Sequence, residues 1–502
     1  MTSDRAVNFE DVPGRAAQRL SSRSRLLVRA SVVQRALIAG AIVSIVLAPA
    51  YWSASPWIGP AIATTVFVLW HGAIAAYQAP WLPGVIALGA CLQWVLAPWG
   101  IYVMQRDHLV PMMAVPAAQY FAFAVPSTIA LVVGLYLPLW RRRGAGDLEA
   151  LVSRAQVPAG FARLCDLMLG GALAVRVAVL PFAPASLRYA AYLVSLLALV
   201  AVLSQMLLNV AGWRWRAILV LAVAAVGNAA DLQFLEMLLF ALSMAMMYYF
   251  RFRPRLRTLA AVIVPAAIFF LALSAFKVHN RDQVRQLDLD QRERATVTGV
   301  TIYQLVKQPA LLFSAEIVGA SMNRLNEGWV TSRILAWVPG GEPYAEGETI
   351  ATALRAALVP RILDPGKYVA GGATLVPRFT GLTLINSTSI GLSVPGEMYA
   401  NFGLDGAWIG TFFYGLILGL VYRSFLNRAR RSVLWLAWMP FVFFGALSVE
   451  PALGEVLNHV TKTLFLLWVV VSIVPQWRSL RRARPGIVPG SRGGEVRMGS
   501  VG

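Results

Sequence analysis

The chain has 502 residues, of which 58% are hydrophobic and only 14% charged, and its mean hydropathy is +0.63. A soluble domain of this length cannot bury so much apolar surface, so the composition predicts a polytopic membrane protein. The net charge of +20 would suggest nucleic-acid binding in a soluble protein. In a membrane protein basic residues collect in cytoplasmic loops, so we expect no nucleic-acid partner. Long apolar runs, rather than short alternating strands, predict an all-α fold and not an outer-membrane barrel.

The chain begins with a polar, arginine-rich stretch, residues 1–33, which lacks the short apolar core of a cleaved signal and is expected to be a cytoplasmic tail. Residues 34–276 are predicted to form transmembrane helices one to nine, and residues 403–476 helices ten to twelve. Residues 477–502 form a basic tail rich in Gly and Pro, which we expect to be cytoplasmic and disordered. The twelve predicted spans are 34–53, 57–77, 82–104, 118–140, 160–181, 185–210, 214–230, 231–250, 257–276, 403–422, 433–449 and 459–476.

The basic residues predict the orientation of these spans. If the N-terminus is cytoplasmic and the spans alternate, the arginine clusters at 141–143, 251–257 and 423–431 all fall on the cytoplasmic side. Arg106 is then the only arginine or lysine in the short outward loops. This asymmetry satisfies the positive-inside rule and predicts that both termini are cytoplasmic.

Residues 277–402 then form one large periplasmic loop between helices nine and ten. A connection of this length is expected to be a functional element that is partly helical. Helical periodicity is present at 301–325 and at 349–359, where Pro360 would end the helix.

Several chemistries lack their sequence signals. The chain has neither a GxxxxGK[ST] phosphate loop nor a GxGxxG turn, so no nucleotide cofactor is indicated. Its four histidines and its two cysteines, Cys91 and Cys165, show no metal-binding spacing. The first outward loop, "SASPW", has no acidic pair, which disfavours glycosyltransferases that use polyprenyl-phosphate sugars. No paired broken helices support an alternating-access transporter. We therefore expect no cofactor.

Two cations of the outward loop stand on stiff turns. Arg361 follows Pro360, and Lys367 follows the turn sequence that begins at Asp364. Such a pair suits a diphosphate, because arginine forms bidentate bonds and lysine supplies a point charge. The alternative is that both form ordinary salt bridges with nearby acids. Arg324 and Arg333 form a further cluster in the same loop.

The stretch "VPGEMYANFGLDG", residues 394–406, places polar residues at the mouth of predicted helix ten. Its glycines predict points of close backbone approach, and Glu397, Tyr399 and Asn401 would lie at the membrane surface. Glu397 either has a chemical role or is an acid favoured by the positive end of its own helix.

Charged residues inside spans are functional candidates by default. Arg163 and Asp166 lie three residues apart and are placed to neutralise each other. Arg176 has no local acid, so it would either bind a lipid phosphate or pair with Asp231 or Glu236, and we favour the pairing.

The order of "LVPRILDPGK" (358–367) and "GEMYANFGLDGAWIGTFFYGLILG" (396–419) resembles the Wzy-type O-antigen or oligosaccharide repeat-unit polymerases. The resemblance is closest over residues 324–420. It implies an enzyme of the bacterial inner membrane that joins undecaprenyl-diphosphate-linked oligosaccharides on the outer face into a surface polysaccharide. Diphosphate is the leaving group, and neither nucleotide nor metal is required. The implied partners are these lipid-linked substrates, the bilayer and a chain-length regulator protein.

Within this interpretation, cations stabilise the charge that grows on the leaving diphosphate. Arg361 and Lys367 are the first candidates, followed by Arg324 and Arg333, and Arg176 is a candidate contact to a lipid phosphate.

The accepting hydroxyl needs a general base, for which Glu397 and His459 are the candidates. Tyr399 and Asn401 would hydrogen-bond the sugar. His459, which follows Glu455 by one helical turn, is alternatively an interfacial residue without a chemical role.

Two other functions share part of this pattern. An O-antigen ligase would use a similar outward loop and similar arginine chemistry but a different acceptor. A lipid-linked oligosaccharide flippase would carry cations along many helices and would not need so long a loop, so the loop favours an enzyme.

Overall fold

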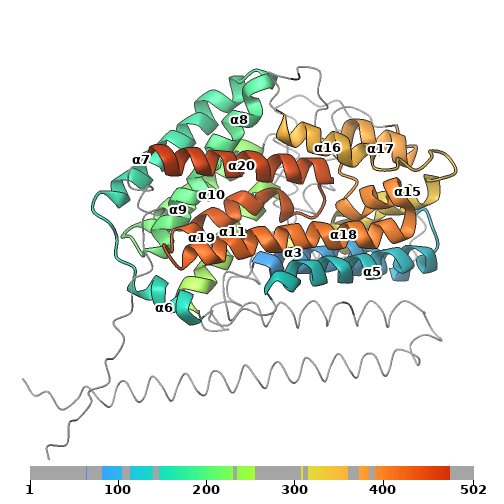
Figure 1. Ribbon diagram of the computed structural model, residues 1–502, viewed down its shortest axis with the longest axis horizontal. Coiled ribbons are helices and arrows are strands. Elements are labelled where there is room, and N and C mark those ends of the chain that lie inside the picture. Colours follow the sequence, from blue (N-terminus) through green and yellow to red (C-terminus); the bar gives the residue numbers. More distant parts are fainter. Residues whose placement is uncertain are drawn as a thin grey trace, which may run out of the picture.

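The structure is a computed structural model (Figure 1). It describes residue 64 and residues 82–104, 113–139, 146–229, 235–254, 307–308, 315–359, 364, 372–383 and 390–474. Within these ranges the only regular secondary structure is helical, as the composition predicts. Seven of the described helices are long and apolar enough to cross a membrane.

The twelve predicted spans are tested only in part. Those at 34–53, 57–77 and 257–276 lie outside the described residues, as do both terminal tails. The predicted span 214–230 corresponds to a helix of 17 residues, and 433–449 to the shorter apolar segment Trp435–Ala446. The seven candidate spans are Leu82–Tyr102, Ala117–Leu139, Phe161–Phe182, Ser186–Leu207, Leu235–Phe252, Val394–Ala429 and Leu453–Ile473.

A buried helix organises one part of the molecule. Every residue of α9 (Leu197–Leu207) is buried, because this helix is apolar on all sides and other helices surround it. Its neighbours are α7, α8, α10, α11 and α19. The helices of this part are α6 (Gly146–Arg154), α7 (Phe161–Ala174), α8 (Ala185–Ser195), α10 (Trp213–Ala229), α11 (Leu235–Phe252) and α19 (Trp435–Phe443).

The most extensive helix packing in the described ranges joins α5 (Ala117–Tyr136) to α18 (Val394–Ala429). Glycines allow the two backbones to touch, as in other membrane helix pairs. A Cβ added at Gly134 would lie 2.3 Å from the carbonyl oxygen of Phe412, and one added at Gly415 would lie 2.5 Å from that of Leu131. The helices α3 (Leu82–Ala90) and α4 (Ala97–Met104), joined by a π-helical segment at 91–96, pack beside α5.

The helix α18 is interrupted at Gly403, whose φ of 71° and ψ of −160° are not helical. The 36 residues of α18 would extend about 54 Å, well beyond a hydrocarbon core of about 30 Å. The break therefore separates a short segment, 394–402, from a membrane-length segment, 404–429. The predicted tenth span begins at this break.

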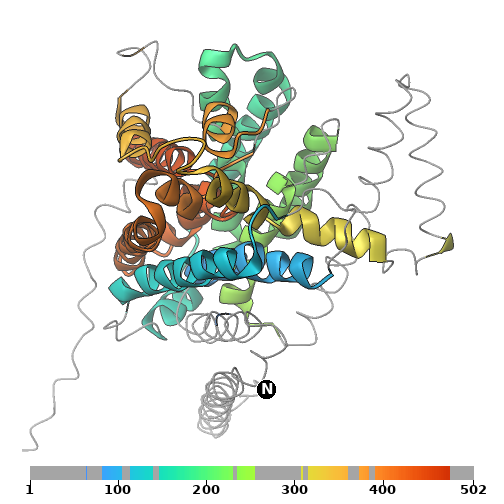
Figure 2. The ribbon, with the colours of Figure 1, turned by 90° about the vertical axis from the view of Figure 1, so that its right-hand side faces the viewer.

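Four helices gather with the short segment of α18 at one end of the bundle, on the right in Figure 1 and facing the viewer in Figure 2. The helix predicted at 349–359 is confirmed, and of the range 301–325 the last eleven residues form a helix. The helices at this end are α14 (Ala315–Leu325), α15 (Gly328–Trp337), α16 (Glu348–Leu358) and α17 (Gly372–Thr380). The last helix, α20 (Leu453–Ile473), packs along α16.

Candidate functional site

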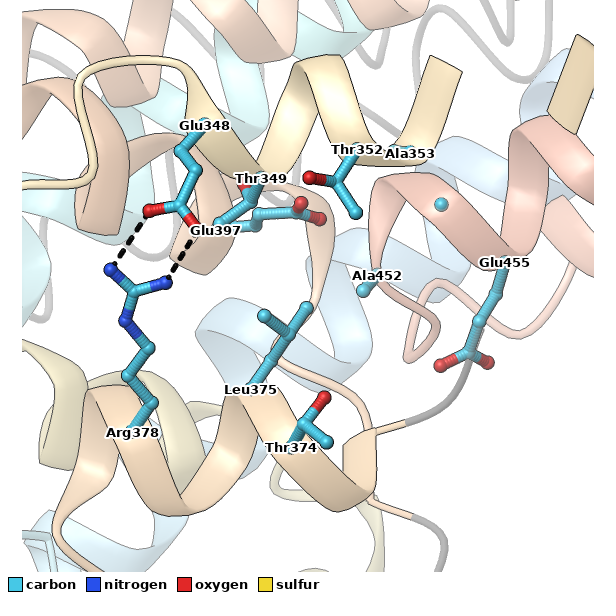
Figure 3. Close-up of a pocket in the computed structure, with 11 residues that line it drawn as sticks. Glu348, Thr349, Thr352, Ala353, Thr374, Leu375, Arg378, Glu397, Ala452 and Glu455 are labelled. Atoms are coloured by element: carbon cyan, nitrogen blue, oxygen red, sulfur yellow. Dashed lines mark hydrogen bonds and ion pairs between the residues drawn. The ribbon is translucent and has the colours of Figure 1, made fainter. Parts of the chain in front are cut away.

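A cavity of about 240 Å³ lies among α16, α17, the start of α18 and the start of α20 (Figure 3). The described residues that line it supply three carboxyl groups, three threonine hydroxyls and one guanidinium group. They are Glu348, Thr349, Thr352, Ala353, Thr374, Leu375, Arg378, Glu397, Ala452, Gly454 and Glu455.

Three helices begin at this cavity, and each brings a glutamate in its first turn. These are Glu348 in α16, Glu397 in α18 and Glu455 in α20. A helix N-terminus carries unpaired N–H groups and a partial positive charge, so it stabilises a carboxylate placed beside it. The cavity therefore combines acidic side chains with the positive ends of three helices.

Glu397 caps a helix other than its own. Its side chain is buried at 1% exposure, and its Oε2 accepts a hydrogen bond of 2.7 Å from the backbone N–H of Leu453, the first residue of α20. The Thr349 hydroxyl also hydrogen-bonds this carboxyl group. The sequence suggested a helix-end role as one alternative for Glu397, and the structure gives that role to the neighbouring helix while leaving the carboxyl group in the cavity wall.

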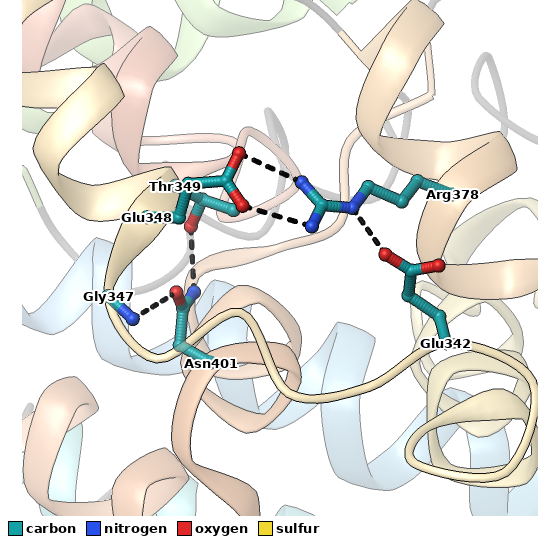
Figure 4. A network of polar contacts seen from close by, with 6 residues as sticks. All are labelled: Glu342, Gly347, Glu348, Thr349, Arg378 and Asn401. Carbon is teal, nitrogen blue, oxygen red and sulfur yellow. Dashed lines mark hydrogen bonds and ion pairs between the residues drawn. The ribbon is translucent and has the colours of Figure 1, made fainter.

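Asn401 joins the start of α16 to α18 (Figure 4). Its Oδ1 accepts a 2.9 Å hydrogen bond from the N–H of Gly347, and its Nδ2 donates to Thr349 Oγ1 at 2.7 Å and to the carbonyl oxygen of Glu397 at 2.8 Å. The residue is 1% exposed and does not line the cavity. All three of these bonds are within the protein, so its predicted contact with a sugar has no support in this geometry.

Tyr399 is likewise directed into the protein. Its ring packs edge-on against Phe123 and Tyr344, with ring centroids 5.9 Å and 6.2 Å away. Its hydroxyl lies 3.5 Å from the carbonyl oxygen of Val338. The ring belongs to the apolar core beneath α15, and its hydroxyl is not among the groups that line the cavity.

Arg378 is the cation that the described structure places in the cavity wall. Its terminal nitrogens donate to the two carboxylate oxygens of Glu348 at 3.1 and 3.0 Å, and its Nε donates to Glu342 at 2.6 Å. Hydrogen bonds to Glu348 and then to Glu342 raise the pKa of Arg378, and those from Arg378 hold the pKa of Glu348 below its usual value. This fork therefore joins α17 to the start of α16.

Arg378 was not among the residues selected from the sequence, although a signal was present. The stretch "LVPR" occurs at 358–361, where it suggested Arg361, and again at 375–378. The second copy carries the arginine that reaches the cavity. Arg361 and Lys367 themselves lie outside the described residues, so the proposed clamp stays a prediction.

His459 is buried but is not among the residues that line the cavity. Its Nε2 lies 3.0 Å from the carbonyl oxygen of Phe441, and its Nδ1 lies 3.1 Å from the Tyr189 hydroxyl. The tautomer with hydrogen on Nε2 satisfies both contacts. One turn earlier on α20, Glu455 does line the cavity, and its Oε1 is shielded from solvent without a hydrogen-bond partner in the described structure.

The remaining predicted cations lie elsewhere. Arg324 is exposed on α14, and Arg333 is half-buried on α15 with its Nε shielded and without a hydrogen-bond partner among the described residues. Neither lines the cavity.

Arg176 pairs with Glu236 through two hydrogen bonds of 2.7 and 2.5 Å, as the sequence analysis favoured over contact with a lipid. The expected neutralisation of Asp166 by Arg163 is wrong. Asp166 instead pairs with Arg216 of α10 at 2.8 Å, because the neighbouring helix brings a guanidinium group against it.

Two glutamates that no motif suggested, Glu327 and Glu450, influence each other's charge. Burial raises the pKa of Glu450, and burial together with the charge of Glu450 raises the pKa of Glu327 well above its usual range. Glu450 belongs to the turn before α20, and its carbonyl oxygen accepts a 3.1 Å hydrogen bond from the N–H of Ser393, the residue before α18. This turn therefore fixes the starts of α18 and α20 relative to each other.

The described residues contain no group of three or more His, Cys, Asp or Glu side chains arranged to hold a metal ion. No family model, curated protein or solved structure matches the chain. The likeness to the polymerases consequently remains one of short motifs, and a function assigned to this cavity depends mainly on the chemistry of its side chains.

Proposed function

We propose that this protein is a membrane glycosyltransferase that polymerises undecaprenyl-diphosphate-linked oligosaccharide repeat units on the outer face of a bacterial inner membrane. The observation that carries the proposal is the cavity whose wall contains Glu397, Glu455 and Arg378. The cavity lies where two candidate membrane helices, α18 and α20, begin. A lipid-linked substrate has its reacting sugar and diphosphate at this level of a bilayer.

The composition of the cavity suits a sugar. Carboxylates and threonine hydroxyls are hydrogen-bonding partners for sugar hydroxyl groups. The volume of about 240 Å³ is below the roughly 300–1,000 Å³ of most small-molecule sites, so it would admit one end of an oligosaccharide rather than a whole repeat unit. The cavity wall contains three glutamates and one arginine. This excess of acidic groups favours a neutral sugar ring, rather than a complete diphosphate group, as the occupant of the cavity.

The two buried carboxyl groups would divide the work on the acceptor. Glu397 already holds hydrogen bonds to the protein, so it has a fixed place from which to position a sugar hydroxyl. Glu455 lines the same cavity, and its carboxylate would accept the proton of the attacking hydroxyl. The acceptor oxygen then bonds to the anomeric carbon of the donor, while the bond from that carbon to the diphosphate breaks.

Arg378 would stabilise the leaving diphosphate, which takes the electron pair of the broken bond. Its fork now binds Glu348, and a phosphate group presents the same bidentate geometry with more charge. Arg361 and Lys367 would add charge on the same side, as the motif around them suggests. A phosphate group of the donor would replace the Glu348 carboxylate as the partner of Arg378. The site would then select donors that carry a diphosphate.

The proposed topology retains twelve spans, cytoplasmic termini and a periplasmic segment at 277–402. Its support is the distribution of arginine, together with the grouping of α14 to α17 at one end of the bundle.

The test is elongation by the purified protein in lipid nanodiscs, supplied with undecaprenyl-diphosphate-linked repeat units. The expected product is a ladder of longer lipid-linked chains. Glu455→Gln should lower the rate about 100-fold or more, which is the usual scale for loss of a general base. Glu346→Gln is the matched control, because Glu346 is exposed and does not line the cavity.

Absence of a ladder with the native substrate would refute polymerisation. Transfer of a chain to a non-repeat acceptor, again without a ladder, would indicate a ligase. Equal loss in both glutamine variants would remove Glu455 from the reaction.

A further inference from the structure

The helix α16 has apolar side chains on two opposite faces. One face is buried against α20 and consists mostly of small residues, which allow close approach of the two helices. The other carries Leu354 and Leu358, one turn apart, which are 45% and 67% exposed. Large apolar side chains that share one exposed face of a helix mark a contact surface. The buried residues of α16 are Thr349, Ala353, Ala356 and Ala357.

The contact with α20 indicates how deep α16 lies in the membrane. The 21 residues of α20 extend about 31 Å, which matches a hydrocarbon core of about 30 Å. Its start at Leu453 therefore lies at one boundary of that core. A Cβ added at Gly454 would lie 3.3 Å from the Cβ of Ala353, so the middle of α16 is at the same boundary.

The second membrane-length helix gives the same depth. The long segment of α18 begins after the break at Gly403, and its flanking residues Phe402 and Leu404 are exposed and apolar. A Cβ added at Gly347, directly before α16, would lie 3.4 Å from the ring of Phe402. Two independent helices thus place α16 beside the edge of the hydrocarbon core.

We propose that α16 lies at a membrane–water interface and inserts Leu354 and Leu358 into the acyl region of the bilayer. At this depth apolar side chains enter the lipid, while charged ones remain among the headgroups. Arg355 fits this placement, because its side chain is 70% exposed beside the two leucines and pairs with Asp364 at 2.8 Å.

This position of α16 also determines the depth of the cavity in the membrane. Thr349, Thr352 and Ala353 of α16 line the cavity, whereas Leu354 and Leu358 do not. The same helix would therefore separate lipid from the cavity at headgroup level. A ligand with a membrane-bound tail could keep the tail in the bilayer while its headgroup occupies the cavity. Only this last step, the identity of the ligand, rests on the proposed function.

The test uses nitroxide labels on Leu354→Cys and Leu358→Cys in lipid nanodiscs. Oxygen, which concentrates in the acyl region, and a water-soluble nickel chelate report the surroundings of each label. Glu346→Cys is the matched control, since Glu346 is exposed beside the start of α16 among acidic residues. The native cysteines Cys91 and Cys165 are buried, and labelling of the unmodified protein measures their background.

The expected result is a ratio of oxygen to nickel accessibility at least tenfold higher at positions 354 and 358 than at position 346. Nickel accessibility equal to that of the control would place α16 in water and overturn the proposal. Low accessibility to both reagents would mean that protein, such as a second copy of the chain, covers the leucines, and would also overturn it. Because no turnover is measured, the result is independent of whether the protein transfers sugars.

Discussion

The side chain of Asn401 offers a quantitative test of how the cavity is held together. Its three hydrogen bonds reach the N–H of Gly347, the hydroxyl of Thr349 and the carbonyl group of Glu397. Asn401→Ala removes all three and leaves their partners shielded from water. The bonds to Gly347 and Thr349 join α18 to the start of α16, whereas the bond to Glu397 lies within α18. Each lost bond costs about 0.5–1.5 kcal/mol, so loss of the two joining bonds should weaken the docking of α16 on α18 by about 1–3 kcal/mol.

Hydrogen exchange followed by mass spectrometry measures this loss directly. A peptide covering residues 347–358 reports the local opening of α16. Because each 1.4 kcal/mol is a factor of ten, a loss of about 1–3 kcal/mol should speed exchange roughly 5- to 150-fold. Thr352→Ala is the control, since Thr352 lies on the same helix and takes no part in the three hydrogen bonds of Asn401. Its exchange should change by less than about threefold.

An Asn401→Ala variant whose α16 exchanges within threefold of the wild type would refute this account. It would show that apolar packing against α20, rather than the asparagine, holds the helix in place.

Three further predictions concern other parts of the molecule. Arg378→Ala should raise the KM for the lipid-linked donor at least about tenfold, because a charge-assisted hydrogen bond contributes about 1.5–3 kcal/mol, and steady-state elongation assays measure it. Gly328→Ala should lower the Tm, because its Cβ would lie 2.2 Å from the Tyr120 hydroxyl, whereas Gly170→Ala meets no atom within 4 Å and should not. Burial raises the pKa of Glu327, so the folded state holds its proton more tightly than the unfolded state. Stability should then fall as pH rises above about 4.3 towards neutral, and Glu327→Gln should flatten that fall in melts recorded from pH 5 to 8.

Hydropathy predicted the long apolar helices of the described residues, because their apolar runs are local properties of the chain. Within the described residues, seven of the predicted spans are present as membrane-length helices. The break in α18 at Gly403 was harder to predict from the sequence. A glycine in an apolar run allows a left-handed φ, but only the contacts made by 394–402 with neighbouring helices show that the chain uses it.

The candidate site was predicted in part, for the same physical reason. Glu397 was selected from its polar surroundings in one stretch of sequence, and it does line the cavity. Arg378 and Glu455 reach the cavity through the packing of α17 and α20, which a single sequence does not reveal. His459 was selected from its position at the end of the predicted last helix, yet both its ring nitrogens have partners within the protein.

The polar block at the mouth of α18 has a structural task that explains its composition. Glu397 accepts from the first N–H of α20, while Asn401 accepts from the N–H that precedes α16. One turn of α18 thus holds the starts of two other helices, and the carboxyl group that does so also faces the cavity. A ligand that competes for Glu397 would loosen the first turn of α20, where Glu455 is located. Binding at one carboxyl group and the position of the other are therefore mechanically linked, and this link follows from the helix caps alone.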